Sequence, residues 1–357
     1  MKPKYLLLLL IFCLAISITG CKEQYSRYTY EFIGAFDTTI QIVGYAKNQK
    51  EFETMGDYAQ QRFMELHKLY DIYNDYEGIN NIKTINDNAG IKPVKVEKAI
   101  IDLILKSKEW YSETNGKCNI ALGPMLNIWH EYRDAGKNDP ENAALPPMSE
   151  LENAMQYTDI NKVIIDEENS TIFLEEKNMR LDVGAIAKGF ATELIVAELV
   201  EKGYDNFAIS SGGNVKAVGR PLVQGRNYWG IGIQDPDGDV NDPDEPSLDI
   251  IYVSNKSVVT SGDYQRTYIV DGKEYHHLID PATLMPAKYF RSVVVVVEDS
   301  GFADFMSTTL FLTPFEEGKE LAEKLGIDAV WVFSDGTLKA TPGAQQRMKN
   351  LGGATGN

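Results

Sequence analysis

Cysteine and histidine are scarce in this sequence of 357 residues, and this limits the kinds of site that it can build. The three cysteines are Cys13, Cys21 and Cys118, and the first two lie near the N-terminus. Only Cys118 is left for the folded part, so no internal disulfide framework is expected. The four histidines form no Cys/His cluster of the kind that holds zinc or an iron–sulfur centre. A metal site must therefore use oxygen ligands, which favours Mg²⁺ or Ca²⁺.

Positive charge is also in short supply. The 35 Lys and Arg residues are outnumbered by 52 Asp and Glu residues, which gives a formal net charge of −17. Because such an acidic surface repels nucleic acid phosphates, no nucleic acid partner is expected. A ligand that carries phosphate groups needs local help from a metal ion or a helix N-terminus.

The first twenty residues are typical of a secretory signal. Two lysines precede an apolar run over residues 5–18, which is too short for a comfortable membrane span. Thr19-Gly20 before Cys21 resembles the lipobox of bacterial lipoproteins, in which the chain is cut before the cysteine and the thiol carries a lipid. An ordinary signal peptide with an incidental cysteine is the alternative. We expect a lipoprotein signal peptide over residues 1–20, lipidation at Cys21, and anchoring at the extracytoplasmic face of the cell membrane.

The remaining sequence shows a mixed helix and strand pattern with no internal repeat. Apolar spacings predict one helix over residues 50–73 and another over residues 96–111. We expect a polar tether over residues 21–30, one large domain over residues 31–341, and a Gly-rich flexible tail over residues 342–357. The predicted fold class is α+β, with mixed sheets flanked by helices in one compact body that could divide into two lobes.

Three further segments have simple interpretations. Residues 133–147 are rich in Asn, Asp, Ala and Pro, which predicts a surface loop. Residues 234–245 (QDPDGDVNDPDE) look like a calcium loop, but the sixth position counted from Asp235 is Val240 instead of the required glycine, so we interpret them as a solvated acidic loop. The valine run at residues 293–297 predicts a buried strand.

The strongest chemical signal is the segment over residues 180–190 (RLDVGAIAKGF), which leads into a predicted helix over residues 191–202. Such a turn lets backbone N–H groups and the positive helix end face an anion. Lys188 adds a mobile positive charge and Asp182 a carboxylate. Ordinary turn chemistry explains glycines before a helix equally well. The predicted apolar face of the helix consists of Phe190, Leu194, Ala197 and Val200.

A second pair of candidate residues is Asp304 and Thr308. If this segment is helical, their spacing of four places both on one face. A carboxylate and a hydroxyl are hard oxygen ligands that suit Mg²⁺. The alternative is that Asp304 is an ordinary first-turn helix residue and Thr308 an ordinary polar position.

The adjacent histidines His276 and His277 precede an Asp280-Pro281 turn. Neighbouring side chains of a strand point to opposite sides, so we expect at most one of the two histidines to face a site. Because Asp-Pro is a common turn, Asp280 has a structural interpretation.

Taken together, these segments resemble the family of FAD:protein FMN transferases known as ApbE, over residues 32–341. The matching motifs occur in family order, and they are residues 36–38 (FDT), 73–90, 116–129, 182–189 (DVGAIAKG), 212–215 (GGNV), 260–264 (TSGDY), 277–281 and 303–308. Two stretches depart from the family pattern: Phe36-Asp37 stands in place of Met-Gly, and Lys117-Cys118-Asn119 in place of Ala-Phe-Asp. Both lie where the family contacts the flavin nucleotide.

The resemblance implies an ApbE-like, T-fold-related structure and a Mg²⁺-dependent reaction with FAD as substrate. FMN is transferred through a phosphoester bond to a threonine hydroxyl of a partner protein, and AMP is released. By resemblance, the carbonyl of Ala185 together with Asp304 and Thr308 holds Mg²⁺, and His277 steers protons or contacts phosphate. The residues that contact FAD by resemblance are Phe36, Tyr73, Lys117, Cys118, Asn119, Asp182, Lys188 and Ile279.

Two alternatives remain open at this point. An FAD pyrophosphatase would use the same site with water in place of threonine, and would release FMN and AMP. A flavin-binding lipoprotein without catalytic activity is the second, although the pair Asp304 and Thr308 argues against it, because storage of flavin needs no metal ligands. The resemblance implies that the acceptor is a respiratory redox subunit with a short Thr-containing motif.

Overall fold

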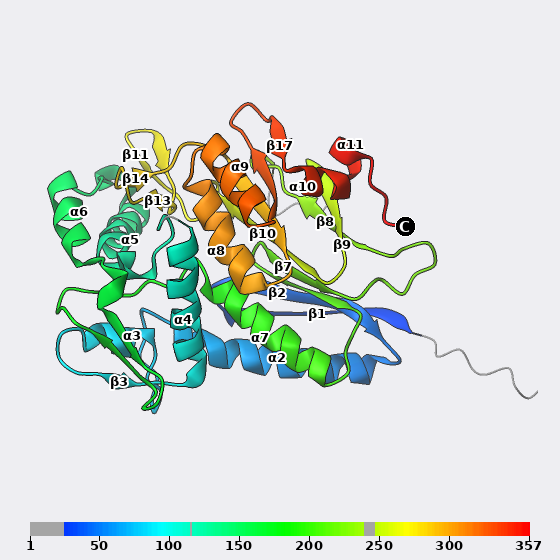
Figure 1. Cartoon of the computed structure of the whole chain (residues 1–357), viewed down its shortest axis with the longest axis horizontal. Helices are drawn as coiled ribbons and strands as arrows, with labels where there is room; N and C mark the ends of the chain where they lie inside the picture. The colour runs from blue at the N-terminus through cyan, green and yellow to red at the C-terminus, as the bar shows by residue number, and fades with distance from the viewer. Residues whose placement is uncertain (1–24, 115, 239–246) are drawn as a thin grey trace, which may run out of the picture.

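The computed structural model describes residues 25–114, 116–238 and 247–357, and its centre is an eight-stranded antiparallel sheet (Figure 1). The strand order is β1-β2-β6-β7-β10-β15-β16-β17, and each neighbouring pair is antiparallel. The strands are β1 (Ser26–Ala35), β2 (Thr38–Ala46), β6 (Phe207–Ser211), β7 (Asn214–Val218), β10 (Lys256–Gly262), β15 (Ser292–Val297), β16 (Asp328–Val332) and β17 (Leu338–Ala340).

The valine run forms the interior strand β15, as the sequence predicts. Val293 and Val295 pack into the core on one face of the sheet, and Val294 and Val296 pack into a second core on the other face. Successive side chains of a strand point to opposite faces, so a strand that is covered on both faces is apolar at every position. The sheet is therefore covered on both faces.

Helices cover the first face of the sheet. Figure 1 shows α2, α7 and α8 lying across it, with α4 beside them. The helices of this part of the structure are α2 (Gln49–Tyr70), α4 (Lys98–Glu113), α7 (Ala187–Glu201), α8 (Ser300–Phe311) and α9 (Phe315–Lys324). The second face is covered by the hairpin of β8 (Trp229–Ile233) and β9 (Asp249–Val253) and by the C-terminal helices α10 (Pro342–Arg347) and α11 (Lys349–Gly352).

The remaining elements gather beside α4 (Figure 1). Some of them form a smaller core of their own around Trp129, and the others pack into the main core. The helices are α3 (Ile82–Asp87), α5 (Gly123–Asn138) and α6 (Met148–Ala154), with short 3-10 helices at Ile120–Leu122, Pro140–Asn142, Met155–Tyr157 and Ile160–Lys162. The strands are β3 (Val94–Lys95), β4 (Val163–Asp166), β5 (Thr171–Leu174), β11 (Tyr268–Val270), β12 (Lys273–Tyr275), β13 (Ile279–Asp280) and β14 (Met285–Pro286). The predicted α+β class is confirmed, but the predicted mixed sheets are wrong, because every strand pair among the described residues is antiparallel. Among the described residues, no helix is long and apolar enough to cross a membrane.

Two of the predicted loose segments differ in the structure, and a third is largely untested. Of the tether over residues 21–30, residues 21–24 lie outside the described residues, while β1 already begins at Ser26 because Tyr28 packs on α2, with its ring 5.6 Å from that of Phe52. The loop predicted over residues 133–147 is helical as far as Asn138, where α5 ends. The acidic loop lies largely outside the described residues, which omit 239–246.

The flexible tail predicted over residues 342–357 is wrong for its first part. This segment forms α10 and α11, and Met348 is fully buried. The Asp249 carboxylate accepts hydrogen bonds from the backbone N–H groups of Asn350 and Leu351, at 2.8 Å and 2.9 Å. A buried methionine and a carboxylate that caps α11 therefore hold the C-terminal segment against β9.

Helix α7 also differs from its prediction. It begins at Ala187, so Lys188 lies in its first turn. Ala197 and Val200, predicted to be on its apolar face, are exposed, because the buried residues follow the side that packs on α2 and α8. The buried residues are Ala187, Gly189, Phe190, Ala191, Thr192, Ile195, Val196 and Leu199.

Candidate functional site

A cavity of about 520 Å³ lies at the start of α7 and along α8. Its volume is within the usual range of a ligand pocket. Its wall includes the β1–β2 turn, the segment that follows α2, the turn before α7 and the loop that follows β10. The structure brings together at this wall every site residue predicted from the sequence, apart from Cys21, which lies outside the described residues. These residues are Phe36, Tyr73, Lys117, Cys118, Asn119, Asp182, Ala185, Lys188, His277, Ile279, Asp304 and Thr308.

Helix α8 carries Asp304 and Thr308 on one face. The helix begins after Asp299, whose side chain accepts a hydrogen bond from the N–H of Phe302 at 2.7 Å. The segment is therefore helical, as the spacing of the two residues requires, and Asp304 lies beyond the first turn. Asp304 is only 6% exposed and Thr308 only 8% exposed. A buried carboxylate at the wall of a cavity needs a compensating partner.

Part of this compensation comes from the first turn of α7. The backbone N–H of Gly189 donates a hydrogen bond to Oδ2 of Asp304 at 2.8 Å, and no other described residue donates to this carboxylate. Burial raises the pKa of Asp304, while the positive charge of Lys188 and the Gly189 N–H act in the opposite direction. Free acceptor capacity on a buried carboxylate is what a divalent cation would complement.

A chain of hydroxyl groups holds the Thr308 side chain. Ser261 Oγ lies 2.7 Å from Ser307 Oγ and 3.3 Å from Thr308 Oγ1, and Ser307 Oγ donates to the carbonyl of Asp304 at 2.9 Å. The described residues contain no group of three or more His, Cys, Asp or Glu that could hold a metal ion. A metal site here must combine Asp304 with neutral oxygens, and the Thr308 hydroxyl and Ala185 carbonyl suit Mg²⁺ by their chemistry.

Phe36 and Asp37, which differ from the family pattern, form the turn between β1 and β2. Ala35 pairs with Thr38, so the two residues form a two-residue hairpin turn, with φ values of 55° and 52°. Positive φ at both positions is the type I′ geometry, which Asp accepts and Phe adopts only with strain. Phe36 gains contacts in return, because its ring lies 5.5 Å from the ring of His67 and 6.4 Å from that of Tyr70. It presents an apolar surface to the cavity.

Lys117, Cys118 and Asn119 also differ from the family pattern, and all three line the cavity. Lys117 makes an ion pair with the buried Asp280 at 3.2 Å. Cys118 is buried, which raises the pKa of its thiol, so it remains protonated. The Asn119 side chain accepts from the N–H of Ala121 at 2.8 Å and also donates to a backbone carbonyl, so its amide already has structural partners.

Tyr73, His130 and Asp182 form a contiguous group at the wall of the cavity. Tyr73 Oη lies 3.0 Å from Nδ1 of His130, and His130 Nε2 lies 3.8 Å from Oδ2 of Asp182. Burial lowers the pKa of His130, and the nearby Asp182 charge partly offsets this. The neutral ring can therefore accept a hydrogen bond from the Tyr73 hydroxyl at Nδ1 and direct its Nε2–H toward Asp182. His130 was not predicted as a site residue, because it lies just beyond the motif over residues 116–129.

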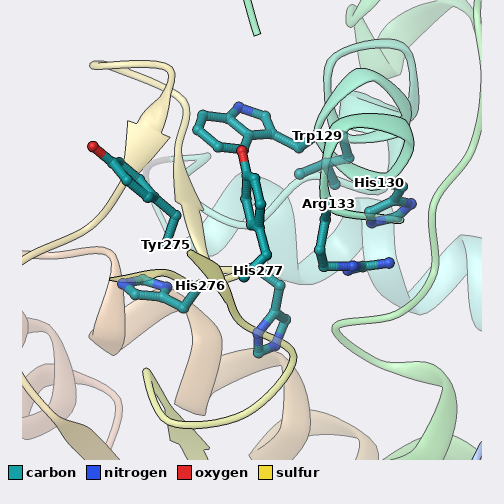
Figure 2. A pocket seen from close by; sticks show the side chains of 8 residues that line it. Trp129, His130, Arg133, Tyr275, His276 and His277 are labelled. Carbon is teal, nitrogen blue, oxygen red and sulfur yellow. The ribbon is translucent and has the colours of Figure 1, made fainter. Parts of the chain in front are cut away.

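The rings of the two adjacent histidines point in different directions (Figure 2). His276 Nε2 lies 2.8 Å from the carbonyl of Ala287, and its ring packs on Phe311. His277 lines the main cavity, and both histidines border an adjoining cavity of only about 10 Å³. At most one histidine faces the larger site, and it is His277.

The hydrogen bond of His277 fixes the roles of its ring nitrogens. Nδ1 lies 3.0 Å from the carbonyl of Gln265. A carbonyl only accepts, so Nδ1 carries the proton and Nε2 keeps its lone pair. Burial by surrounding atoms, reinforced by the positive charge of Arg266, lowers the pKa of His277 to about 3, although part of the ring remains accessible. His277 is therefore neutral at physiological pH, and its Nε2 is free to accept a hydrogen bond.

A protein-family model provides independent evidence for the relationships of this chain. The model described as "ApbE family" matches residues 36–331, which is most of the sequence. The chain belongs to the ApbE family.

Two relatives and one solved structure show how far the ApbE similarity extends. The FAD:protein FMN transferase of Treponema pallidum is 32% identical over 283 residues, which are 76% of this chain and 75% of the relative. That of Klebsiella pneumoniae is 30% identical over 274 residues, which are 76% and 81% of the two chains. The crystal structure of the ApbE protein of Thermotoga maritima superimposes with a TM-score of 0.75 at 26% identity, and the match covers 91% of this chain and 99% of that one.

These matches confirm the family and the fold that the sequence predicts. The roles of the individual site residues stay predictions, although the structure does bring the residues together. Three further residues at or beside the cavity were missed as site residues: His130, Ser261 and Arg266. The last two lie in or just after the motif over residues 260–264, where the sequence indicates only a tight turn.

Proposed function

We propose that this ApbE protein transfers FMN from FAD to a threonine hydroxyl of a partner protein through a phosphoester bond, with release of AMP. The names of its relatives support the reaction class. The observation that carries the proposal for this chain is the buried Asp304 carboxylate, which receives the Gly189 N–H beside Lys188 and Thr308. A divalent cation with the pyrophosphate of FAD would complete this arrangement.

Asp304, the Thr308 hydroxyl and the Ala185 carbonyl would hold Mg²⁺, which when bound would neutralise negative charge on the pyrophosphate oxygens. Lys188, in the first turn of α7, would bind phosphate oxygens together with the positive end of that helix. Asp182, fixed by the N–H of Gly184 at 2.9 Å, would contact FAD at the start of the same turn.

The threonine oxygen of the acceptor would attack the FMN-side phosphorus in line, while the bond from that phosphorus to the AMP phosphate oxygen breaks. The leaving AMP takes the electron pair. Nε2 of His277 would accept the hydroxyl proton, since Nδ1 is held by the Gln265 carbonyl. At the flavin end, Phe36, Tyr73 and Ile279 would supply apolar contact, with the Lys117, Cys118 and Asn119 stretch completing the wall.

The deciding experiment supplies FAD, Mg²⁺ and an acceptor domain with a Thr-containing motif. Flavin fluorescence of the acceptor in a denaturing gel, together with AMP release, is the expected result, and replacement of the acceptor threonine by valine should abolish the label. Release of FMN and AMP with no labelled acceptor would make the chain an FAD pyrophosphatase. Binding of FAD with no AMP release would make it a flavin-binding lipoprotein without catalytic activity.

For the location of the protein, we propose lipidation at Cys21 and display at the extracytoplasmic face of the cell membrane. The support is in the sequence: a charged start, an apolar run, and Thr19-Gly20 before Cys21. A tether at the membrane surface would give the enzyme a high effective concentration of membrane-anchored acceptors, such as respiratory redox subunits. Mass spectrometry of the native N-terminus tests this, and a mature chain that begins elsewhere than a lipidated Cys21 would contradict it.

A further inference from the structure

The cavity holds more unpaired positive charge than the reaction scheme above uses. Lys117, Lys188 and Arg266 line it. Lys117 is paired with Asp280, whereas neither Lys188 nor Arg266 makes an ion pair with any of the described residues. On a protein with a net charge of −17, two unpaired cations at one cavity are unexpected unless an anion binds between them.

Arg266 is held in place by its backbone. It lies in the loop between β10 and β11 with a φ of 51°, a strained value for an arginine. The preceding residue, Gln265, is fixed because its carbonyl accepts a hydrogen bond from Nδ1 of His277 at 3.0 Å. Strain of this kind persists only where the surrounding structure imposes it, and it is concentrated at functional sites.

Arg266 lines the same cavity as His277, Asp304 and Thr308, so it borders the space of the proposed metal ligands and of the proposed proton acceptor. Burial lowers the pKa of both His277 and His130, and the positive charge of Arg266 contributes in the same direction. Its side chain is exposed enough to reach a ligand.

We propose that Arg266 is a second anion-binding residue of this site, in addition to Lys188, and that it binds a phosphate of the dinucleotide pyrophosphate. The planar guanidinium forms paired hydrogen bonds to phosphate oxygens, which the ammonium group of lysine does not. Arg266 thus fixes the orientation of the pyrophosphate, while Lys188 supplies charge from the helix end. The inference rests on the proposed use of FAD, but it concerns binding and does not depend on which group accepts FMN.

The experiment compares four ligands in the full-length protein: FAD and ADP, which carry a pyrophosphate, FMN with one phosphate, and riboflavin with none. Dissociation constants are measured by calorimetry with Mg²⁺ present and absent. The variants are Arg266→Gln, which removes the charge at the same backbone cost, and Arg266→Lys, which keeps it. Arg226→Gln, an exposed arginine in the β7–β8 loop that does not line the cavity, is the matched control.

Arg266→Gln should weaken FAD and ADP binding by about 10- to 100-fold, the usual effect of losing a charge-assisted hydrogen bond. Riboflavin binding should change less than about twofold, because it carries no phosphate. Arg266→Lys should recover part of the FAD affinity, and Arg226→Gln should leave all four ligands unchanged. In the wild type, added potassium chloride should weaken FAD binding more than riboflavin binding.

Unchanged FAD and ADP affinity in Arg266→Gln would overturn the proposal. An equal loss of FAD and riboflavin affinity would also overturn it, because Arg266 would then shape the pocket instead of binding phosphate. If Arg266→Gln fails to fold, the proposal is decided by Arg266→Lys and by the salt dependence of the wild type. Failure of FMN transfer to any acceptor would leave these binding results intact, so the two proposals fail separately.

Discussion

The backbone N–H of Gly189 donates to Oδ2 of Asp304 at 2.8 Å, which joins the first turn of α7 to α8. This contact requires glycine, since a Cβ at position 189 would lie 2.2 Å from the carbonyl oxygen of Ser300 and 2.6 Å from Cβ of Asp304. Two segments that are 115 residues apart in sequence therefore meet at a point where neither can move without the other. The proposed Mg²⁺ site and phosphate site are built on this junction.

Asp304→Asn should abolish Mg²⁺ binding and FMN transfer while leaving the fold intact. The amide oxygen can still accept the Gly189 N–H, and removal of a buried charge lowers the desolvation cost, so stability without Mg²⁺ should be equal or higher. Loss of a residue that only hydrogen-bonds to a metal ligand typically lowers metal affinity or activity by about 10- to 100-fold. Loss of the ligand carboxylate itself should therefore lower activity by at least about 100-fold. A Mg²⁺ titration followed by calorimetry and activity measures both effects.

The companion variants are Asp304→Ala, which should also be inactive, and Thr308→Ala, which should weaken Mg²⁺ binding less because a hydroxyl is the poorer ligand. Wild-type turnover by Asp304→Asn, or by the wild-type protein in excess chelator, would rule out the metal site as described.

Gly189→Ala should destabilise the protein by about 1–3 kcal/mol, the usual cost of overpacking, because the new methyl group must push α7 and α8 apart. It should also weaken Mg²⁺ binding, since the Asp304 carboxylate would lose its fixed position. Urea unfolding measures the first effect and a Mg²⁺ titration the second.

Gly318→Ala is the control for this substitution. Gly318 is also helical, but its Cβ would meet only ordinary contacts, the nearest at 3.6 Å, so alanine should be neutral or stabilise by up to about 1 kcal/mol. Equal stability of the two alanine variants would contradict the close approach of α7 and α8.

The stability of the protein should fall on acidification, partly because of His277. Its folded-state pKa is lowered to about 3, whereas an unfolded histidine titrates near 6.5. Between these values the unfolded chain binds a proton that the folded chain does not, so the free energy of unfolding falls as the pH falls through about 6.5 toward about 3.

His277→Gln should remove this contribution, so it should lose less stability than the wild type between about pH 7.5 and about pH 5. The difference should be at most about 2 kcal/mol, and smaller to the extent that the ring is accessible to solvent. Urea unfolding at both pH values measures it. Parallel losses in the two proteins would show that His277 is not held neutral by its surroundings.

Sequence patterns predicted the parts of the fold that depend on local periodicity. The valine run predicted β15, and the spacing of Asp304 and Thr308 suits the helix that carries them. The prediction failed where a distant partner decides the structure: α11 is held by Asp249, which lies about one hundred residues earlier in the chain. The apolar face of α7 was wrong for the same reason, since its neighbours α2 and α8 determine which side is buried.

In the candidate site, too, residues in local motifs were predicted and residues that depend on distant contacts were missed. Residues within short motifs, such as Asp182 and Lys188, were found from sequence because motif and resemblance coincide. His130 was missed, because only the fold brings this residue of α5 next to Tyr73 and Asp182. Arg266 was missed because an arginine after a tight turn has no distinctive sequence signature, and its importance follows from the absence of an ion-pair partner among the described residues.

The balance between transfer and hydrolysis should depend on Tyr73. Its side chain is 52% exposed, lines the cavity, and is held by the hydrogen bond to His130 at 3.0 Å. A ring held in this position restricts the access of water to the flavin end, so its removal should favour hydrolysis over attack by threonine. Tyr73→Ala should therefore release more free FMN for each acceptor labelled, whereas Tyr73→Phe, which keeps the ring but loses the hydrogen bond to His130, should lie between Tyr73→Ala and the wild type.

Both products are measured in one reaction: labelled acceptor by gel fluorescence, and free FMN by chromatography. Tyr228→Ala is the control, because Tyr228 is an exposed tyrosine (40%) that does not line the cavity, and its ratio of products should equal that of the wild type. If Tyr73→Ala slows both products equally, Tyr73 contributes to FAD binding alone, and the exclusion of water must come from the acceptor itself when it docks over the cavity.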